Sequence, residues 1–434
     1  MKRSLNRLDS SLRRFASEET DEAFTLRLYQ EMLGRPADTG GLSEGTRKLG
    51  LGLMRRGHLR KDMASSPEHR AVSKIRKAQH ALAHGPAPAT GRRLAASPPK
   101  EIWLELTTRC NIVPACAMCG YASADSRPPR RDMDPETWRS LLPLLLQARH
   151  VGLHGAGEPL LYPFLGDLLE ALQPSRAIVG FNSNGHLLTA AASRRLVGQG
   201  LGWISISLDA ATARTYLRIR RRPDFDVLLS RIGGLRKIRD AAGSKRPQIE
   251  INMTLMKLNL EEAPAFVEVA ADLGLDRVMF QEIQPGGAQR VVAPDGFVFD
   301  YREQELAGDG RRDALLGQAR ERARALGVQF SCELLYGPRA PTHAPPDEAA
   351  PQSSTVTTQP MCGEPWERLM LNVHGDAFVC CIQLRNEVLL GRTPDDSFEE
   401  IWNGRRARIV REAMFGEPAP SYCRGCYRTS GHSE

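Results

Sequence analysis

Three closely spaced cysteines constrain this chain more than any other feature of its sequence. Cys110, Cys116 and Cys119 follow a short apolar run, Ile102 to Leu106, at CX5CX2C spacing. A strand that ends in a loop with three thiols suits a metal site, because three thiolates can hold three irons of a [4Fe–4S] cluster and leave the fourth iron open. The alternative is a structural zinc site, whose fourth ligand is missing from this loop. The spacing therefore favours an iron–sulfur cluster.

The string LELTTRCN…CAMC around these cysteines resembles the signature of radical S-adenosylmethionine (SAM) enzymes. That family usually has CX3CX2C, so this loop has two additional residues between Cys110 and Cys116. The resemblance implies that Cys110, Cys116 and Cys119 hold the SAM-binding [4Fe–4S] cluster, with Met118 at the cofactor. It also implies that the protein reductively cleaves SAM to a 5′-deoxyadenosyl radical, which abstracts hydrogen from a substrate.

From residue 101 onward, short apolar runs alternate with helical patterns, which is typical of a parallel sheet or barrel. Six βα units predict an α/β fold, a partial (β/α)6 TIM-like barrel, as in the family that the chain resembles. Sites of βα-barrels collect at the carboxyl ends of the strands. Strands are expected at 101–107, 149–154, 177–182, 202–208, 247–255 and 277–283. Helices are expected at 135–147, 162–173, 189–198, 211–219, 225–241 and 260–273. One more helix and strand is expected within 311–335.

The segment after the second expected strand, HGAGEPL, resembles the GGEP motif of the family, which holds the methionyl amino group of SAM. Ala156, Gly157 and Glu158 are the matching residues. Glycines let the backbone come close to a ligand, and a carboxylate beside exposed carbonyl oxygens suits an ammonium group. A plain turn is the alternative interpretation.

Further SAM contacts are expected after the third and fourth strands and in the helix that follows. Ser183, Ser207 and Asp209 are candidates for the ribose hydroxyls, although Asp209 could instead be a helix N-cap. Arg220 resembles the arginine that pairs with the SAM carboxylate. Strands five and six offer polar side chains that could touch adenine or substrate: Asn252, Thr254, Gln281 and Glu282.

The last seventy residues have the pattern C…GX4C…CX2C with EIWN in between. This resembles the auxiliary-cluster domain of radical SAM enzymes, in the short one-cluster form called twitch and not the longer SPASM form. The resemblance implies an auxiliary [4Fe–4S] cluster, and a zinc ribbon is the alternative. The GX4C count favours Cys380 over Cys381. The expected ligands are Cys362, Cys380, Cys423 and Cys426.

Residues 1–100 contain 20 Lys and Arg against 10 Asp and Glu, an excess of +10 in a chain of net charge +8. This basic start could dock an acidic partner, a nucleic acid or a membrane surface, or form a solvated face. Aromatic residues are not interleaved as in a single-strand binder, so no nucleic acid is expected. The phrase FTLRLYQEMLGRPADTGGL is similar to a small helical domain appended to bacterial surface-layer proteins, glycosyltransferases and methyltransferases.

The expected organisation is a helical accessory domain at 17–75, a linker at 76–99, the barrel at 100–335, a flexible linker at 336–360 and the auxiliary-cluster domain at 361–430. No apolar run is long enough to span a bilayer, and the basic start lacks the apolar core of a secretion signal. The protein is therefore expected to be cytoplasmic. The N-terminal domain is a candidate docking site for a protein partner.

The resemblance implies an oxidoreductase that receives electrons from a flavodoxin- or ferredoxin-type donor. Two substrate classes compete, a carbohydrate-like alcohol such as a sugar or aminocyclitol, and a ribosomally made peptide. Relatives that modify peptides often carry a winged-helix module at the N-terminus, and this helical start does not resemble one. A carbohydrate-like substrate is therefore the expected one, and a peptide is the alternative. A protein that is not an enzyme, a metal-loaded scaffold or binding protein, is a further alternative.

Overall fold

Two units make up the chain, residues 1–86 with 386–388, and the remaining residues. The computed structural model describes residues 20–33, 39–51, 54, 56–65, 94–121, 129–283, 290–292, 296–306, 310–333, 362–380, 388–415 and 423. Within these residues, no helix has both the length and the apolar character that a membrane span requires.

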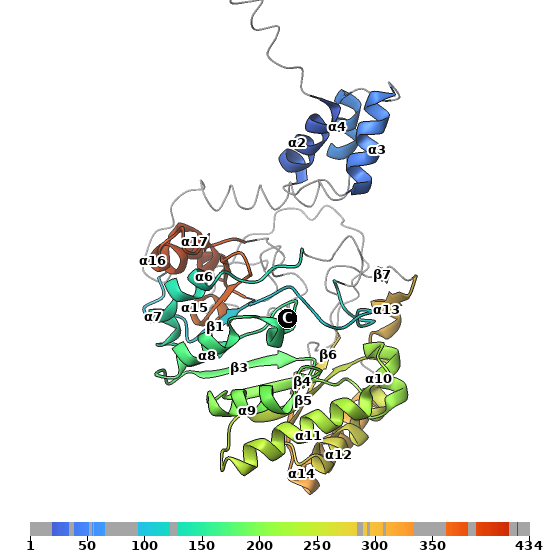
Figure 1. The fold of residues 1–434 in the computed structure, drawn as a ribbon, viewed down its shortest axis with the longest axis vertical. Helices are drawn as coiled ribbons and strands as arrows, with labels where there is room; N and C mark the ends of the chain where they lie inside the picture. The colour runs from blue at the N-terminus through green and yellow to red at the C-terminus, as the bar shows by residue number, and fades with distance from the viewer. Residues whose placement is uncertain are drawn as a thin grey trace, which may run out of the picture. The chain divides into compact units, whose positions relative to one another are not determined.

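The described residues of the first unit form three helices, α2 (Asp21–Leu33), α3 (Thr39–Gly50) and α4 (Arg56–Ala64) (Figure 1). Apolar side chains at helical spacing form its core, among them Phe24 and Leu28 of α2, Leu49 of α3 and Met63 of α4. Within the domain expected at 17–75, the described residues are thus largely helical.

The second unit is organised around one sheet of ten strands in the order β12-β11-β10-β1-β2-β3-β4-β5-β6-β9. Seven of these strands run parallel in chain order, as the βα pattern predicts, and each expected strand is present. Their bounds are β1 (Glu101–Leu104), β2 (His150–Gly152), β3 (Ile178–Ser183), β4 (Trp203–Ser207), β5 (Gln248–Leu255), β6 (Arg277–Glu282) and β9 (Gln329–Glu333).

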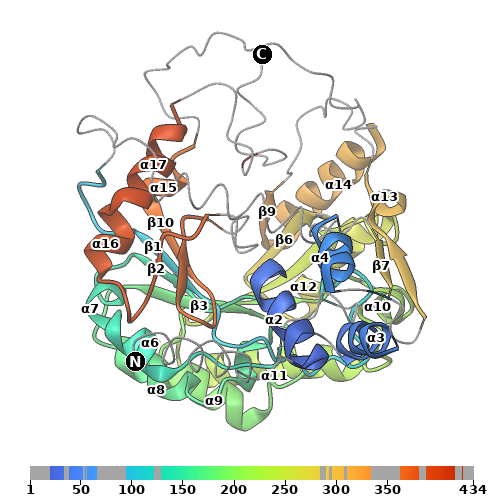
Figure 2. The same cartoon turned by 90° about the horizontal axis from the view of Figure 1, so that it is seen from above.

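Helices lie along the outer side of the arc that the strands form, as Figure 2 shows for α8, α9, α11 and α14. The sequence specifies this side, because alternate residues of β5 such as Ile249, Ile251 and Met253 are fully buried against the helices. The helices are α6 (Pro135–Ser140), α7 (Leu142–Leu145), α8 (Leu165–Leu172), α9 (Ala190–Gly198), α10 (Ala213–Arg220), α11 (Phe225–Ala241), α12 (Ala263–Asp272) and α14 (Gly310–Leu326). Single turns η3 (Pro159–Leu161) and η4 (Leu260–Glu262) precede α8 and α12. The architecture is a partial TIM-like barrel.

The last part of the chain extends the same sheet. β10 (Arg368–Leu371) pairs in parallel with β1, in the register Glu101 to Arg368 through Leu104 to Leu371. β11 (Asp376–Phe378) and β12 (Gly391–Arg392) then continue antiparallel. The helices of this part are α15 (Glu364–Glu367), α16 (Phe398–Asn403) and α17 (Arg405–Ala413).

The end of the expected 76–99 linker is bonded to α16. The indole Nε1 of Trp402 donates to the carbonyl oxygen of Ser97 at 2.9 Å. The side chain of Asn403 accepts from the backbone N–H of Ala95 and donates to its carbonyl oxygen. Ala95 is itself buried. Residues 94–100 therefore belong structurally with the part of the chain that follows them.

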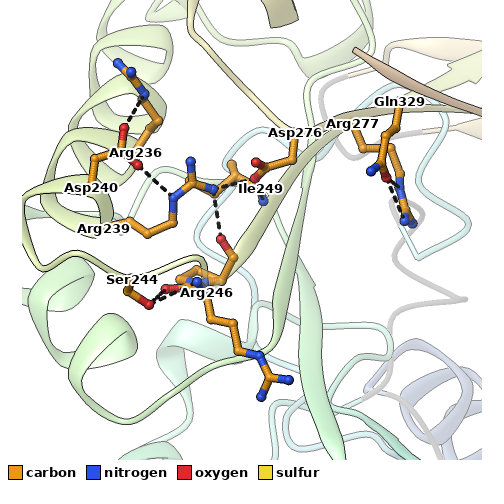
Figure 3. A network of polar contacts seen from close by, with 10 residues as sticks. Arg236, Arg239, Asp240, Ser244, Arg246, Ile249, Asp276, Arg277 and Gln329 are labelled. Carbon is orange, nitrogen blue, oxygen red and sulfur yellow. Dashed lines mark hydrogen bonds and ion pairs between the residues drawn. The ribbon is translucent and has the colours of Figure 1, made fainter. Parts of the chain in front are cut away.

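A polar network ties α11 to the amino ends of β5 and β6 (Figure 3). Arg239 of α11 forms an ion pair with Asp276 and donates to the carbonyl oxygen of Pro247. The same Asp276 accepts from the backbone N–H of Ile249 at 2.7 Å. This network lies at the amino ends of β5 and β6, opposite the carboxyl ends where the candidate site is expected.

Candidate cluster and SAM site

All three cysteines of the CX5CX2C loop line one hollow at the carboxyl end of β1. Ala156, from the turn after β2, lines the same hollow. The other lining residues are Thr108, Ile112, Ala115, Tyr121 and Arg130. The expected ligands therefore face one space, and the expected SAM-binding turn borders it.

Burial raises the pKa of the Cys110 thiol and raises that of Cys119 to about 11. In the metal-free protein both groups are protonated near neutral pH, and a metal must displace the protons to bind. Within the described residues, no three Cys, His, Asp or Glu side chains converge on a point that could hold a single ion. Each thiolate of a cubane binds a different iron, so its ligands need only surround the hollow. The donor set fits a cluster of this kind.

The turn Gly155 to Glu158 lies directly against the cysteine loop. A Cβ on Gly157 would lie 2.3 Å from the carbonyl oxygen of Thr107 and 2.6 Å from that of Arg109. The backbone N–H of Glu158 donates to the carbonyl oxygen of Arg109 at 2.7 Å. Only glycine allows this approach at position 157, so the GAGEP motif has a structural reason here.

The carboxylate of Glu158 is occupied within the protein. It accepts from the Ser183 hydroxyl at 2.9 Å and from the backbone N–H of Asn184 at 2.8 Å. Glu158 and Ser183 are 2% and 3% exposed, and burial raises the pKa of Glu158. The expected contacts of Glu158 with the SAM ammonium and of Ser183 with ribose stay predictions. Here the pair joins the turn after β2 to the end of β3.

Asp209 and Arg220 form a buried ion pair. Asp209 is fully buried, has left-handed backbone (φ 61°), and accepts from the backbone N–H of Thr254 at 2.6 Å. Asp209 is not the N-cap of α10, which is Thr212, and its contact with the SAM ribose stays a prediction. Burial disfavours the charge of Arg220, but Asp209 and the sulfur of Cys116 more than compensate and raise its pKa. Nη1 of Arg220 donates to the Cys116 sulfur at 3.5 Å.

The remaining expected contacts divide between two faces of the sheet. Ser207 and Asn252 are directly paired neighbours on β4 and β5, on the face away from the helices. Gln281 lies on that face too and donates to the Thr254 hydroxyl at 3.3 Å. Glu282 points the other way and bonds Arg312 of α14 at 2.6 Å, so its proposed role at adenine or substrate is wrong. The sequence offered Gln281 and Glu282 together, and they lie on opposite faces because side chains alternate along a strand.

The auxiliary cysteines are described in part. Cys362, Cys380 and Cys423 are each partly exposed, whereas Cys381 and Cys426 lie outside the described residues. The glycine of the GX4C pattern, Gly375, has φ +80°, and a Cβ there would lie 2.2 Å from the carbonyl oxygen of Thr393. Thiols of this number suit the predicted auxiliary cluster, and the ligand assignment stays a prediction.

Three residues that support the site were not identified from the sequence. Glu105, on the strand that leads into the loop, accepts from the N–H of Ala156 at 2.9 Å and from that of Val373 at 3.3 Å. Asn184 Nδ2 lies 4.0 Å from the Cys110 sulfur. Tyr301 donates to the carbonyl oxygen of Met118 at 2.8 Å. The parity of β1 could have indicated Glu105, because it shares a face with Trp103 and not with the buried Leu104 and Leu106.

Two family profiles match the chain. Residues 104–270 match the Radical SAM superfamily, and residues 362–427 match SPASM, an iron-sulfur cluster-binding domain. The first match contains all three cysteines of the loop, and the second spans the four expected auxiliary ligands.

Relatives of established function match parts of the chain. The tungsten-containing aldehyde ferredoxin oxidoreductase cofactor-modifying protein of Pyrococcus furiosus is 24% identical over 46% of this chain, and the match spans 56% of that relative. The mycofactocin maturase MftC of Mycobacterium tuberculosis is 23% identical over 71% of both chains. In structure, SuiB of Streptococcus suis bound to S-adenosylmethionine gives a TM-score of 0.53 at 15% identity, over 95% of this chain and 87% of that one. This likeness confirms the fold.

Proposed function

Because the chain carries a radical SAM domain and a C-terminal SPASM iron–sulfur domain, we propose that it is a radical SAM oxidoreductase that matures a ribosomally made peptide. The first domain binds a [4Fe–4S] cluster with SAM, and the second binds auxiliary iron–sulfur. The second match is to SPASM and not to the twitch form expected from the sequence, and a single auxiliary cluster stays a prediction. The observation that carries the proposal is the hollow at which Cys110, Cys116, Cys119 and the Ala156 turn meet. When bound, the cluster and SAM supply a 5′-deoxyadenosyl radical for hydrogen abstraction.

The chain's own residues give this site its shape and charge. Gly157 lets the SAM-binding turn approach the cysteine loop, and Glu158 ties that turn to the end of β3. Arg220 places a positive charge at the Cys116 sulfur. The face of the strands that carries Ser207, Asn252 and Gln281 is the proposed substrate side, because it meets the hollow at the carboxyl ends of the strands.

Peptide maturation is better supported than the carbohydrate oxidation expected from the sequence. MftC is a maturase, and its match spans 318 residues. This is longer than the 230 residues from 104 to 333 that form the barrel, so the similarity is not confined to the barrel. SuiB, which shares the fold, has been determined with its precursor peptide SuiA. The sequence-based preference for a sugar came from the helical N-terminal region, which says little about the chemistry at the cluster loop.

Oxidation of a peptide in this site removes two hydrogens. One would leave as an atom to the 5′-deoxyadenosyl radical, which forms 5′-deoxyadenosine, and the other would leave as a proton, with its electron accepted at an auxiliary cluster. The cysteines Cys362, Cys380, Cys423 and Cys426 are the proposed ligands of that acceptor. They suit this role because the strand β10 that follows Cys362 pairs directly with β1, which leads into the cluster loop.

The test is an anaerobic incubation of reconstituted protein with SAM, a one-electron reductant and short peptides encoded next to its gene. We expect 5′-deoxyadenosine and a peptide lighter by two hydrogens, both detected by mass spectrometry. Peptide labelled with deuterium should transfer label to 5′-deoxyadenosine. If SAM is cleaved but a sugar alcohol and none of the peptides is oxidised, the substrate class is wrong. If SAM is not cleaved, the whole proposal fails.

A further inference from the structure

A short segment between β6 and α14 has no place in the main sheet. It contains the antiparallel strands β7 (Arg290–Val292) and β8 (Val298–Asp300), followed by the single turn α13 (Tyr301–Gln304). One face of this hairpin is buried, with Val291 and Phe299 at 2% and 4% exposure. The opposite face carries the exposed Val292 and Val298. A hairpin buried on one face must have a partner surface.

That partner surface is the cysteine loop. The buried face joins a hydrophobic cluster that contains Ala117, with Met118 and Cys119 packed against it. α10 and the segment after β5 supply the rest of the cluster through Ile219 and Met256. The hairpin therefore forms one wall of the loop that carries the expected cluster ligands.

A hydrogen bond fixes this contact. Tyr301 is 2% exposed, and its hydroxyl donates to the carbonyl oxygen of Met118 at 2.8 Å. Met118 lies between Cys116 and Cys119 and is the expected contact of SAM in that turn. A second anchor lies nearby, where the guanidinium of Arg221 is 4.4 Å from the centre of the Phe297 ring. At its far end, the segment accepts from the backbone N–H of Lys257 through the carbonyl oxygen of Gln304.

The additional residues of the CX5CX2C spacing explain why the loop needs external support. A longer loop loses more conformational entropy when it is held in one geometry. Val113, among the residues between Cys110 and Cys116, is 67% exposed and contributes little packing. In the CX2C turn, the Cys119 N–H donates to the Cys116 carbonyl oxygen, and the Ala117 N–H donates to the carbonyl oxygen of Ile219 on α10. The Met118 carbonyl belongs to the same peptide plane as the Cys119 N–H, so the Tyr301 hydroxyl and the Cys116 carbonyl oxygen hold this one peptide from both sides.

We infer that residues 290–292 and 296–304 belong to the frame of the SAM-cleavage site and that Tyr301 is a positioning residue for Met118 and the CX2C turn. The inference rests on the proposed function, since it assumes that SAM binds at this loop. The Tyr301 hydroxyl acts through the backbone of Met118 and does not itself take part in the reaction. Its proposed effect is on the affinity of the cluster loop for SAM.

The test compares Tyr301→Phe with Tyr162→Phe. Both changes keep a buried ring and remove a hydroxyl that donates to a backbone carbonyl oxygen, that of Met133 in the case of Tyr162. The control also leaves the indole of Trp138 without its partner, so it should destabilise the fold at least as much. Iron content and the electron paramagnetic resonance (EPR) spectrum of the reduced protein are recorded while SAM is added.

We expect Tyr301→Phe to need about three- to tenfold more SAM for the same spectral change, with an unchanged kcat at saturating SAM. Tyr162→Phe should respond as the wild type does. A loss of iron confined to Tyr301→Phe would also support the inference. An unchanged SAM titration in Tyr301→Phe, or an equal shift in both variants, would overturn it.

Two further outcomes separate this inference from the proposed function. If the wild-type spectrum does not respond to SAM, the proposed function fails and the inference falls with it. If Tyr301→Phe does not fold, Phe297→Leu tests the second anchor, with an expected two- to threefold weaker response to SAM. A wild-type response in that variant would overturn the inference alone.

Discussion

Nη1 of Arg220 lies 3.5 Å from the sulfur of Cys116, while the same guanidinium is paired with the buried Asp209. A positive charge and an N–H donor at a cluster thiolate stabilise the reduced, more negative cluster. Through this contact, Arg220 would affect the reduction potential of the cluster even without bound SAM. This role differs from the expected pairing of Arg220 with the SAM carboxylate, and the two roles make different predictions.

Removal of the charge should make the first cluster harder to reduce. In the double variant Arg220→Met with Asp209→Asn, we expect a reduction potential on the order of 60 mV lower without SAM, a tenfold change in the one-electron equilibrium. The single variant Arg220→Met should lose roughly 3–5 kcal/mol of stability, because it leaves a buried carboxylate unpaired. Redox titration monitored by EPR measures the potential. A potential unchanged without SAM, together with weaker SAM binding, would favour the carboxylate role.

Metal content tests the two sets of cysteines. Two [4Fe–4S] clusters correspond to about eight irons per chain, and the change of Cys110, Cys116 and Cys119 to Ala should leave about four. That variant should not cleave SAM. Anaerobic iron and sulfide analysis gives the counts, and zinc in place of iron after reconstitution would contradict the prediction.

The auxiliary domain is predicted to act after SAM cleavage. Replacement of Cys423 and Cys426 by Ala should leave 5′-deoxyadenosine formation intact and stop product, because the substrate radical then lacks its electron acceptor. Chromatography of both products provides the measurement, and circular dichroism must match the wild type, since a lost cluster can unfold its domain. A folded variant without this cluster that forms product at the wild-type rate would leave the domain a purely positioning role.

Two truncations test where the N-terminal region ends. A chain that begins at Ala87 should fold, load both clusters and cleave SAM, if residues 1–86 are a separate module. A chain that begins at Pro98 should be less stable, by roughly 1–3 kcal/mol, because Trp402 and Asn403 lose their partners at Ser97 and Ala95. Thermal unfolding compares the two. Equal melting temperatures would show that these contacts contribute nothing to stability.

Acid should destabilise the protein partly through His154. Burial, and then the nearby charge of Arg368, lower the pKa of His154 to about 4, from about 6.5 in the unfolded chain. Between these values the unfolded state binds a proton that the folded state does not, so stability is fully present above pH 6.5 and falls towards pH 4. From pH 7 to 5 the loss is about 1–2 kcal/mol.

Urea unfolding of the metal-free protein at both pH values measures this loss, and His154→Gln should lose correspondingly less than the wild type. His186, whose pKa burial also lowers to about 4, contributes equally to both proteins and cancels in the comparison. An identical loss in the wild type and the variant would rule out His154 as the titrating group.

The strands and helices of the barrel could be predicted from the sequence because apolar residues recur with a spacing typical of each kind of element. The alternation along β5 and the Thr189 and Thr212 caps of α9 and α10 are local signals. The three cysteines and Gly157 were recognisable because CX5CX2C and GAGEP are local motifs that resemble those of the family. The physical reason for Gly157, its approach to the carbonyl oxygens of Thr107 and Arg109, required the structure.

The partners of buried charges could not be predicted in the same way. Asp209 pairs with Arg220 eleven positions later, and Glu158 accepts from Ser183 twenty-five positions later. The sequence alone does not distinguish such a partner within the protein from a bound ligand. The supporting role of Tyr301 depends on a contact 183 positions away. Such pairings are set by how strands align in the sheet and not by local sequence.

The parallel pairing of β1 with β10 has a mechanical consequence. β1 leads into the first cysteine loop, and β10 leads into the turn before Cys380, so the backbone hydrogen bonds between them fix the two attachment points to each other. Domains joined in this way cannot hinge apart without breaking a row of sheet bonds. A chain cut before residue 361 would also expose the edge of β1, which is a template for pairing with other molecules. The barrel alone should therefore be prone to aggregation. Any motion that admits substrate must come from elements other than the paired strands β1 and β10.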